Sequence, residues 1–200
     1  TRSVNRLAQL YFKENNYEES LKYYKDLELI SKNNREKIDS YVGSLTNYYF
    51  LKKFDSVQYY SQQINNFDKI SFNNRNKINL LSAKSYIESG NTSTGIDKLL
   101  TTINLVKDES AAEANYLLAK IFFDQGQKNQ ALESLYSLNE NFSNYQFWVG
   151  KSYILIAEIF ISMGENFQAN ATLESLIENT DIILIKNEAE ELINKLNTDD

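Results

Sequence analysis

The sequence predicts an all-α protein, a stack of about five helix hairpins followed by one C-terminal capping helix. Three observations support this prediction. The 200 residues contain no proline and only six glycines, so little interrupts helices except short polar connections. A pattern of small and bulky residues recurs five times, starting at residues 8, 45, 83, 119 and 157. The content of 42% hydrophobic and 24% charged residues is ordinary for a soluble folded domain.

Each instance of the pattern has a small or compact residue, a bulky residue three positions later, and a second pair beyond a polar break. Small residues let two helices approach closely, while the bulky residue on the same face fills the space between them. The spacing therefore predicts two packed helices in each instance. The five instances are Ala8-Tyr11-Ser20-Tyr24, Leu45-Tyr48-Val57-Ser61, Ala83-Tyr86-Gly95-Leu99, Ala119-Phe122-Ala131-Leu135 and Ala157-Phe160-Ala169-Leu173.

These instances divide residues 1–180 into repeats of about 4–33, 38–70, 76–107, 111–143 and 147–179. A tight turn is expected inside each repeat. In the last three repeats Gly90, Gly126 and Gly164 stand where the end of a helix favours a left-handed residue. Between the second and third repeats, Arg75, Lys77 and the surrounding asparagines are interpreted as a solvated loop between helices.

Residues 181–197 are predicted to form the capping helix, with Asp181 as its N-cap. Apolar residues recur there at helical spacing, and charged residues occupy the other face. A polar outer face is what the end of a repeat stack needs, and Asp199-Asp200 is expected to end the chain in solvent. The sequence shows no matching cap before the first repeat, so we expect the N-terminus to be a cut through a longer stack.

The fourth repeat, with Ala119, Phe122, Gly126, Ala131 and Leu135, closely resembles the tetratricopeptide repeat family. The fifth repeat resembles it nearly as well, whereas the second and third are degenerate. The family's proline and its early tryptophan are absent, and each unit is two to four residues longer than the usual period of about 34. The resemblance implies a right-handed superhelical stack that acts as a scaffold for protein–protein interaction rather than as an enzyme.

In that family the first helix of each hairpin lines the concave surface, where a partner helix or extended segment binds. On this resemblance we expect an apolar track beside a polar track along the stack, unless these side chains pack on one another. The matching inner positions also include Asn5, Gln9, Val42, Leu80 and Ile154. The expected protein-binding residues are Phe12, Thr46, Tyr49, Lys84, Ile87, Tyr116, Lys120, Phe123, Glu158 and Ile161. Suitable cations and amides are too scattered to predict a clamp for a C-terminal carboxylate.

The absence of cysteine and histidine excludes disulfides, the familiar zinc sites and nucleophile–histidine pairs. We therefore expect no catalytic residues, no cofactor and no metal. A carboxylate hydrolase using Glu158 and Asp124 would require a deep pocket and a raised pKa. The net charge of −6, without a basic cluster, speaks against nucleic acid as a partner, and no apolar run reaches membrane-spanning length.

The leading functional prediction is an interaction scaffold within a larger bacterial protein, resembling the repeat regions of cell-envelope assembly factors. The alternative is a structural spacer or a self-association module without a separate ligand. Composition does not decide between the cytoplasm and the periplasm or cell envelope. The single tryptophan, Trp148, either staples one repeat to the next or serves as an exposed binding anchor, and stapling is favoured.

Overall fold

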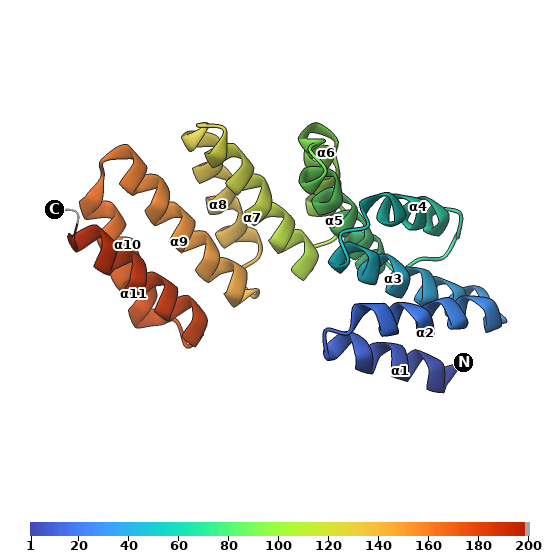
Figure 1. The fold of residues 1–200 in the computed structure, drawn as a ribbon. Helices are drawn as coiled ribbons and strands as arrows, with labels where there is room; N and C mark the ends of the chain where they lie inside the picture. The colour runs from blue at the N-terminus through green and yellow to red at the C-terminus, as the bar shows by residue number, and fades with distance from the viewer. Residues whose placement is uncertain (199–200) are drawn as a thin grey trace. The chain divides into compact units, whose positions relative to one another are not determined.

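The computed structural model describes residues 1–198, so Asp199 and Asp200 lie outside the described residues. Every regular element in this part of the chain is an α-helix, which confirms the all-α prediction (Figure 1). The helices are α1 (Arg2–Lys13), α2 (Tyr17–Ile30), α3 (Asn34–Phe50), α4 (Phe54–Asn65), α5 (Phe72–Glu88), α6 (Thr92–Leu105), α7 (Glu109–Asp124), α8 (Lys128–Asn141), α9 (Gln146–Met163), α10 (Asn166–Asn179) and α11 (Ile183–Thr198).

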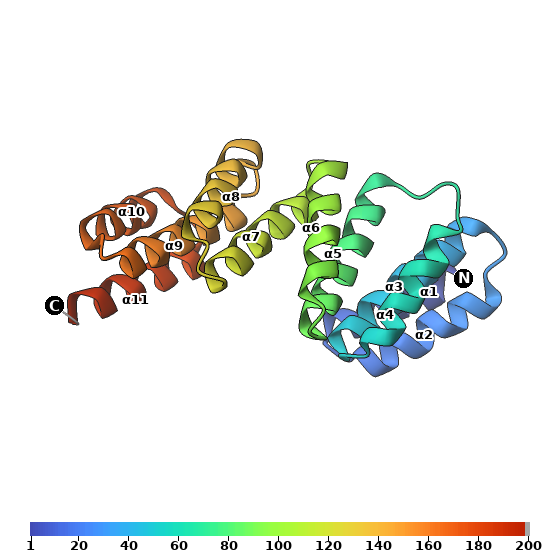
Figure 2. The same cartoon turned by 90° about the horizontal axis from the view of Figure 1, so that it is seen from above.

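The chain divides into two compact units, Thr1–Val106 and Lys107–Asp200. The first unit contains three hairpins, α1/α2, α3/α4 and α5/α6, in which α3 contacts the helices on both sides of it (Figure 2). The second unit contains the hairpins α7/α8 and α9/α10, and the single helix α11 packs against both α9 and α10. In both units the first helices of successive hairpins lie next to one another, because α3 contacts α1 and α5, and α9 contacts α7.

The recurring pattern marks the packed interior of each hairpin. Its first position is fully buried in all five instances, at Ala8, Leu45, Ala83, Ala119 and Ala157. Its later positions are buried as well, on the second helix of the same hairpin. In the first hairpin the helices also share a hydrogen bond, since Ser20 Oγ donates to the carbonyl of Ala8 at 2.8 Å. The pattern therefore reports helix-to-helix packing, as its chemistry predicted.

The turn inside each hairpin has the same backbone form. One residue in each turn has a positive φ, and the N–H next to it donates to the carbonyl of the aromatic residue in the repeated pattern. Glycine fills this position in the last three hairpins, as predicted. In the first two it is filled by Asn15, with φ 57°, and Lys52, with φ 55°. The first two turns therefore have the same backbone geometry as the last three although they contain no glycine.

Residues 73–77 belong to a helix, so their interpretation as a solvated loop is wrong. Helix α5 begins at Phe72, and the side chain of Ser71 accepts a hydrogen bond from the N–H of Asn74 at 3.3 Å. Inside this first turn Asn76 is buried and its Nδ2 donates to the carbonyl of Val106 at 2.9 Å. The cap and the buried amide stabilise a helix where the density of polar residues indicated a loop.

Helix α11 closes the second unit mainly through apolar contacts. Ile185 and Ala189 are fully buried, and Gly150 of α9 leaves room for Ile185, because an added Cβ would lie 2.7 Å from that side chain. The helix begins at Ile183, so the prediction that Asp181 is its N-cap is wrong. Instead Thr180 Oγ1 accepts from the N–H of Ile182 at 3.2 Å.

Trp148 joins neighbouring hairpins of the second unit. Its ring lies 5.6 Å from that of Tyr116 on α7, and it packs against the cluster of Ala111, Ala112 and Phe142. These contacts confirm the favoured interpretation of the tryptophan as a staple.

Candidate functional site

Three adjoining pockets surround the first half of α3 in the first unit, and we call them together the α3 groove. They adjoin because they share lining residues: Asp39 lines all three, Arg35 and Asn74 line two each, and Asn5 lines two. The walls come from α1, α3 and α5, the first helices of the three hairpins, with contributions from α2 and the connecting loops. The α3 groove is therefore located on the helices that the family resemblance assigns to partner binding.

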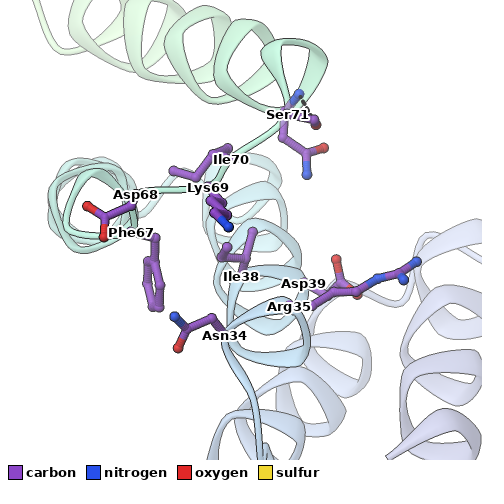
Figure 3. A pocket seen from close by; sticks show the side chains of 10 residues that line it. Asn34, Arg35, Ile38, Asp39, Phe67, Asp68, Lys69, Ile70 and Ser71 are labelled. Carbon is purple, nitrogen blue, oxygen red and sulfur yellow. Dashed lines mark hydrogen bonds between the residues drawn. The ribbon is translucent and has the colours of Figure 1, made fainter.

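The largest of these, the α5 pocket, has a volume of about 700 Å³ and lies between the first turns of α3 and the segment that joins α4 to α5 (Figure 3). Ile38 and Ile70 give it an apolar wall, and Asp68 and Lys69 stand at the connecting segment. Figure 3 shows the side chains of Arg35 and Asp39 leaving α3 on the same side. A third pocket of about 360 Å³, the α1 pocket, lies between the start of α1 and the start of α3.

The central pocket, of about 240 Å³, is lined by all three first helices. Gly43 of α3 shapes its floor, because the ring of Tyr24 from α2 lies where a Cβ at residue 43 would be. The glycine thus lets an aromatic ring from the helix behind reach the pocket. The complete lining is Asn5, Gln9, Phe12, Tyr24, Asp39, Val42, Gly43, Thr46, Asn47, Asn74 and Lys77.

Asn47 provides an unsatisfied acceptor in the central pocket. The residue is fully buried, and its Nδ2 donates to the carbonyl of Gly43 at 2.8 Å. That bond sets the orientation of the amide, and among the described residues Oδ1 has no hydrogen-bond partner. A buried polar atom without a partner costs free energy, typically about 1–3 kcal/mol. The oxygen is itself buried, so its missing partner is a feature of the packing around α3.

Two charged groups face this region from different helices. Burial raises the pKa of the Asp39 carboxyl, and Arg35 opposes the shift by its positive charge. Lys77 of α5 is exposed as a whole residue, but burial of its amine lowers its pKa. The described residues contain no ion pair between Asp39 and Lys77, although both line the central pocket. The pocket therefore offers an acidic and a basic group to a ligand.

The expected binding residues of the first unit divide into two groups. Phe12 and Thr46 line the central pocket, where the Thr46 hydroxyl donates to the carbonyl of Val42 at 2.7 Å. Tyr49 donates its hydroxyl hydrogen to Glu88 at 2.5 Å, and the Lys84 amine lies 5.1 Å from the centre of the Tyr49 ring. Ile87 packs instead inside its own hairpin, in the notch left by Gly95. Phe12, Tyr49 and Ile87, which were predicted to form one apolar track, therefore each contact a different set of residues.

The expected residues of the second unit lie on α7 and α9, which contact one another. Tyr116, Phe123 and Ile161 are partly buried against the hydrophobic core, and Lys120 is exposed. Burial, together with the charges of Glu158 and Glu188, raises the pKa of Tyr116 to about 12.

A chain of opposite charges continues from this surface to α11. Lys151 of α9 pairs with Glu188 of α11 at 2.6 Å. Burial of the Glu158 carboxyl raises its pKa, and the charge of Lys120 opposes that shift. These residues form a mixed-charge face on α7, α9 and α11.

The alternative acidic pair, Glu158 and Asp124, is only partly supported. The pKa of Glu158 is raised, and Asp124 contributes to that shift by its negative charge. The second unit has a pocket of about 540 Å³ between α9 and α10, but its lining includes neither carboxylate. Within residues 1–198 no group of acidic side chains could hold a metal ion, and no helix is both long and apolar enough to cross a membrane.

The sequence reasoning missed the residues that make the central pocket distinctive: Tyr24, Asp39, Gly43, Asn47, Asn74 and Lys77. Asn74 and Lys77 lie in the segment that the sequence predicts to be a loop. Tyr24 is buried in the hairpin core, as its place in the repeated pattern predicts, and it also lines the pocket. Asp39, Gly43 and Asn47 follow one another at intervals of four residues, so they lie on one face of α3. This run of polar and small residues was the available signal.

Two segments of the chain match family models described as tetratricopeptide repeat, residues 1–34 and residues 113–145. They coincide with the first and fourth hairpins. No curated protein sequence matches the chain.

Several solved structures share the fold. The C-terminal part of a TPR repeat-containing protein from Cytophaga hutchinsonii is 18% identical, covering 92% of this chain and 69% of its own, with a TM-score of 0.67. MamA is 14% identical, and the match covers 88% of this chain and 90% of the MamA chain with a TM-score of 0.62. YrrB, a TPR protein with an unusual peptide-binding site, is 13% identical. The match covers 94% of this chain and 90% of the YrrB chain with a TM-score of 0.58. The two family matches show that this chain contains tetratricopeptide repeats, which are repeats of protein-interaction scaffolds, and its successive hairpins have the fold of that superfamily.

Proposed function

We propose that this scaffold binds an extended segment of a partner protein in the α3 groove. The observation that carries the proposal is a pocket lined by polar side chains from the first helices of three successive hairpins. Asn5, Gln9 and Asn74 supply side-chain amides to this pocket. A side-chain amide has donors and an acceptor, as a peptide group has, so an extended main chain could pair with several of them.

The polar lining favours an extended segment over a helix. A helix satisfies its own backbone groups internally, so only its side chains would pair with the amides of Asn5, Gln9 and Asn74. Peptide recognition by main-chain hydrogen bonds leaves alternate side chains free to enter pockets. The chain YrrB, which shares the fold, has a peptide-binding site, and we extend that chemistry to this chain as part of the proposal.

We further propose that the other expected binding residues contribute to partner contact. Tyr49 lies near the C-terminal end of α3, and Lys84 lies near the C-terminal end of α5. Both lie beyond the α3 groove and would extend the binding surface. Tyr116, Lys120, Phe123, Glu158 and Ile161 would form a separate contact surface on the second unit. The net charge of −6 supports a protein or peptide partner rather than nucleic acid.

Selection from a displayed library of random 12-residue peptides on the full chain tests the proposal. Selected peptides are then titrated against Gln9→Ala and Asn74→Ala, which truncate amides of the central pocket. Gln62→Ala and Asn65→Ala, exposed amides on α4, are the matched controls. We expect the groove variants to bind about three- to tenfold more weakly, since each loses hydrogen bonds. Equal effects of both sets, or none, would reject the α3 groove.

A spacer or self-association module remains the second candidate. The observation that favours it is the set of exposed apolar side chains outside the groove, including Leu7 and Leu10 on α1. Light scattering over a range of concentrations separates the two functions. A mass that grows with concentration supports self-association, and a constant monomer mass supports a groove that is free for a partner.

The origin proposed from the sequence is a larger bacterial protein of the cell envelope. Its support is the lysine-, asparagine- and isoleucine-rich composition, together with the similar fold of a protein from Cytophaga hutchinsonii. Fractionation of the source cells, followed by detection with an antibody against this chain, tests the compartment. Recovery in the cytoplasmic fraction alone would contradict an envelope location.

A further inference from the structure

Helix α1 has a row of exposed residues on the side that faces away from its hairpin, and we call this row the basic stripe. It consists of Arg2, Arg6, Leu10 and Lys13. Their spacings of 4, 4 and 3 residues place them on one side of the helix, opposite the fully buried Ala8. All four are exposed, and Leu10 is 50% exposed. Because α1 contains no acidic residue, this side of the helix is positively charged.

Helix α10 has a complementary row on its outer side, and we call it the acidic stripe. It consists of Phe167, Ala171, Glu174 and Glu178, at spacings of 4, 3 and 4 residues. The buried residues of α10 lie on the opposite side of the helix. All four stripe residues are exposed, and Phe167 is 83% exposed, so its ring is available for contact with a partner. No basic residue occurs in α10, so this side of the helix is negatively charged.

The charged groups of both stripes are available to a partner. Within residues 1–198 no ion pair includes Arg2, Arg6, Lys13, Glu174 or Glu178. The same difference in charge extends over the two units. Residues 1–106 include 15 basic and 11 acidic residues, whereas residues 107–200 include 6 basic and 16 acidic residues. Attraction between the first unit of one copy and the second unit of another copy is therefore expected.

The charges of the two stripes match when the helices lie antiparallel. Each stripe is about 16 Å long, at a rise of about 1.5 Å per residue. In an antiparallel pair Arg2 lies opposite Glu178. Arg6 then lies opposite Glu174, because the two charged positions on each helix are four residues apart. A parallel pair with the same overlap would instead place Glu174 against the apolar Leu10. The pattern of charges therefore favours the antiparallel arrangement.

The remaining positions of the same arrangement have matching side chains. Leu10 lies opposite Ala171, so a large side chain meets a small one, which lets the two helices approach closely. Lys13 lies opposite Phe167, where its methylene stem covers apolar surface and its amine is attracted to the ring. These contacts add to the ion pairs, which at an exposed site contribute little by themselves.

We propose that this chain self-associates through the basic stripe of α1 in one copy and the acidic stripe of α10 in another, with the two helices antiparallel. The inference rests on the second candidate function, self-association, and it is independent of peptide binding in the central pocket. A contact between two helix faces is small, so the association is weak and depends on salt. The occupant of each stripe is thus a second copy of the chain.

Sedimentation velocity of the full chain, from about 10 μM to about 1 mM, measures the association. The native mass should grow with concentration in about 0.05 M NaCl and grow less in about 0.5 M NaCl. Arg6→Glu or Glu174→Lys places like charges opposite each other, so each should weaken the association about tenfold or more. A chain that carries both changes should associate nearly as strongly as the native chain, because opposite charges meet again. Phe167→Ala should weaken the association at both salt concentrations, because it removes an apolar contact.

The matched controls are Lys32→Glu and Glu133→Lys, which reverse exposed charges of the same two units outside the stripes. Circular dichroism checks that every variant keeps the native helix content. Association that the stripe variants leave unchanged, that the controls weaken equally, or that the double change fails to restore would overturn the pairing while leaving self-association in place. A monomer at every concentration would reject both. The peptide titrations test the α3 groove separately.

Discussion

Gly43 of α3 lies against the ring of Tyr24 of α2, so closely that a Cβ on residue 43 would be 2.2 Å from a ring carbon. This contact connects hairpin packing with the candidate site. The ring belongs to the core of the first hairpin and is 8% exposed, yet it also lines the central pocket. A side chain at residue 43 would displace it.

Gly43→Ala should therefore destabilise the protein by about 1–3 kcal/mol, the usual cost of overpacking a well-filled core. Urea unfolding measures the change. The control is the same substitution in a Tyr24→Leu background, where the smaller side chain removes the clash and the cost should shrink. An equal cost in both backgrounds would show that the Tyr24 ring is not the cause.

Lys52→Gly should stabilise the protein by about 1 kcal/mol, because a left-handed backbone costs a side-chain-bearing residue about that much. Lys52 has φ 55° in the turn between α3 and α4. Thermal or urea unfolding measures the gain. Asn15→Gly, at the equivalent position of the first hairpin, should gain less because asparagine tolerates this conformation. A loss of stability in Lys52→Gly would contradict the strain.

Gln58→Ala should cost about 1–3 kcal/mol, since it leaves partly buried partners unpaired. The amide of Gln58 joins α4 to α5: its Nε2 donates to Ser85 Oγ at 3.1 Å, and Ser82 Oγ donates to its Oε1 at 2.7 Å. The control is Gln62→Ala, one turn further along the exposed side of α4. Urea unfolding should show a clear loss for the first variant and almost none for the second.

Asp39→Asn should make the protein more stable at pH 7. Burial raises the pKa of Asp39 in the folded protein above its ordinary value of 3.8, so the folded state holds this proton more tightly than the unfolded state. The resulting loss of stability begins as the pH rises through 3.8 and is complete above the folded pKa. The asparagine variant escapes that loss.

Unfolding free energies measured for both proteins at pH 3.5 and pH 7 check this dependence. The stability difference between Asp39→Asn and the native protein should be larger at pH 7 than at pH 3.5. Asp68→Asn, which changes an exposed carboxylate, serves as the control. A variant that is less stable than the native protein at pH 7 would show that Asp39 is stabilising. A stabilised Asp39→Asn that binds more weakly would be typical of a functional residue that costs stability.

Local features of the sequence predicted much of the fold. Four alanines and Leu45, at the first position of the five repeats, predicted five buried contacts because side-chain size limits how closely helices approach. Gly90, Gly126 and Gly164 predicted three turns because only their residue type favours a positive φ. Asn15 and Lys52 escaped this rule, since tertiary packing of the hairpin imposes the turn there despite the residue.

The expected groove shows where such reasoning ends. Equivalent positions in successive repeats predicted one groove through Phe12, Thr46 and Ile87. Phe12 and Thr46 line the central pocket, whereas the side chain of Ile87 lies against Gly95 of its own hairpin. A repeat period identifies equivalent backbone positions, but the direction of each side chain depends on the volumes around it.

The sequence by itself determined the all-α class, the five hairpins and their buried contacts, because periodicity and residue size act between neighbours along the chain. Only the tertiary structure revealed the α3 groove. Its central pocket combines Asn5 of α1, Asp39 and Asn47 of α3, and Lys77 of α5. These residues are far apart in sequence, and a glycine that admits a ring from a fourth helix shapes the space between them. Such a site is a property of packing, which no local pattern encodes.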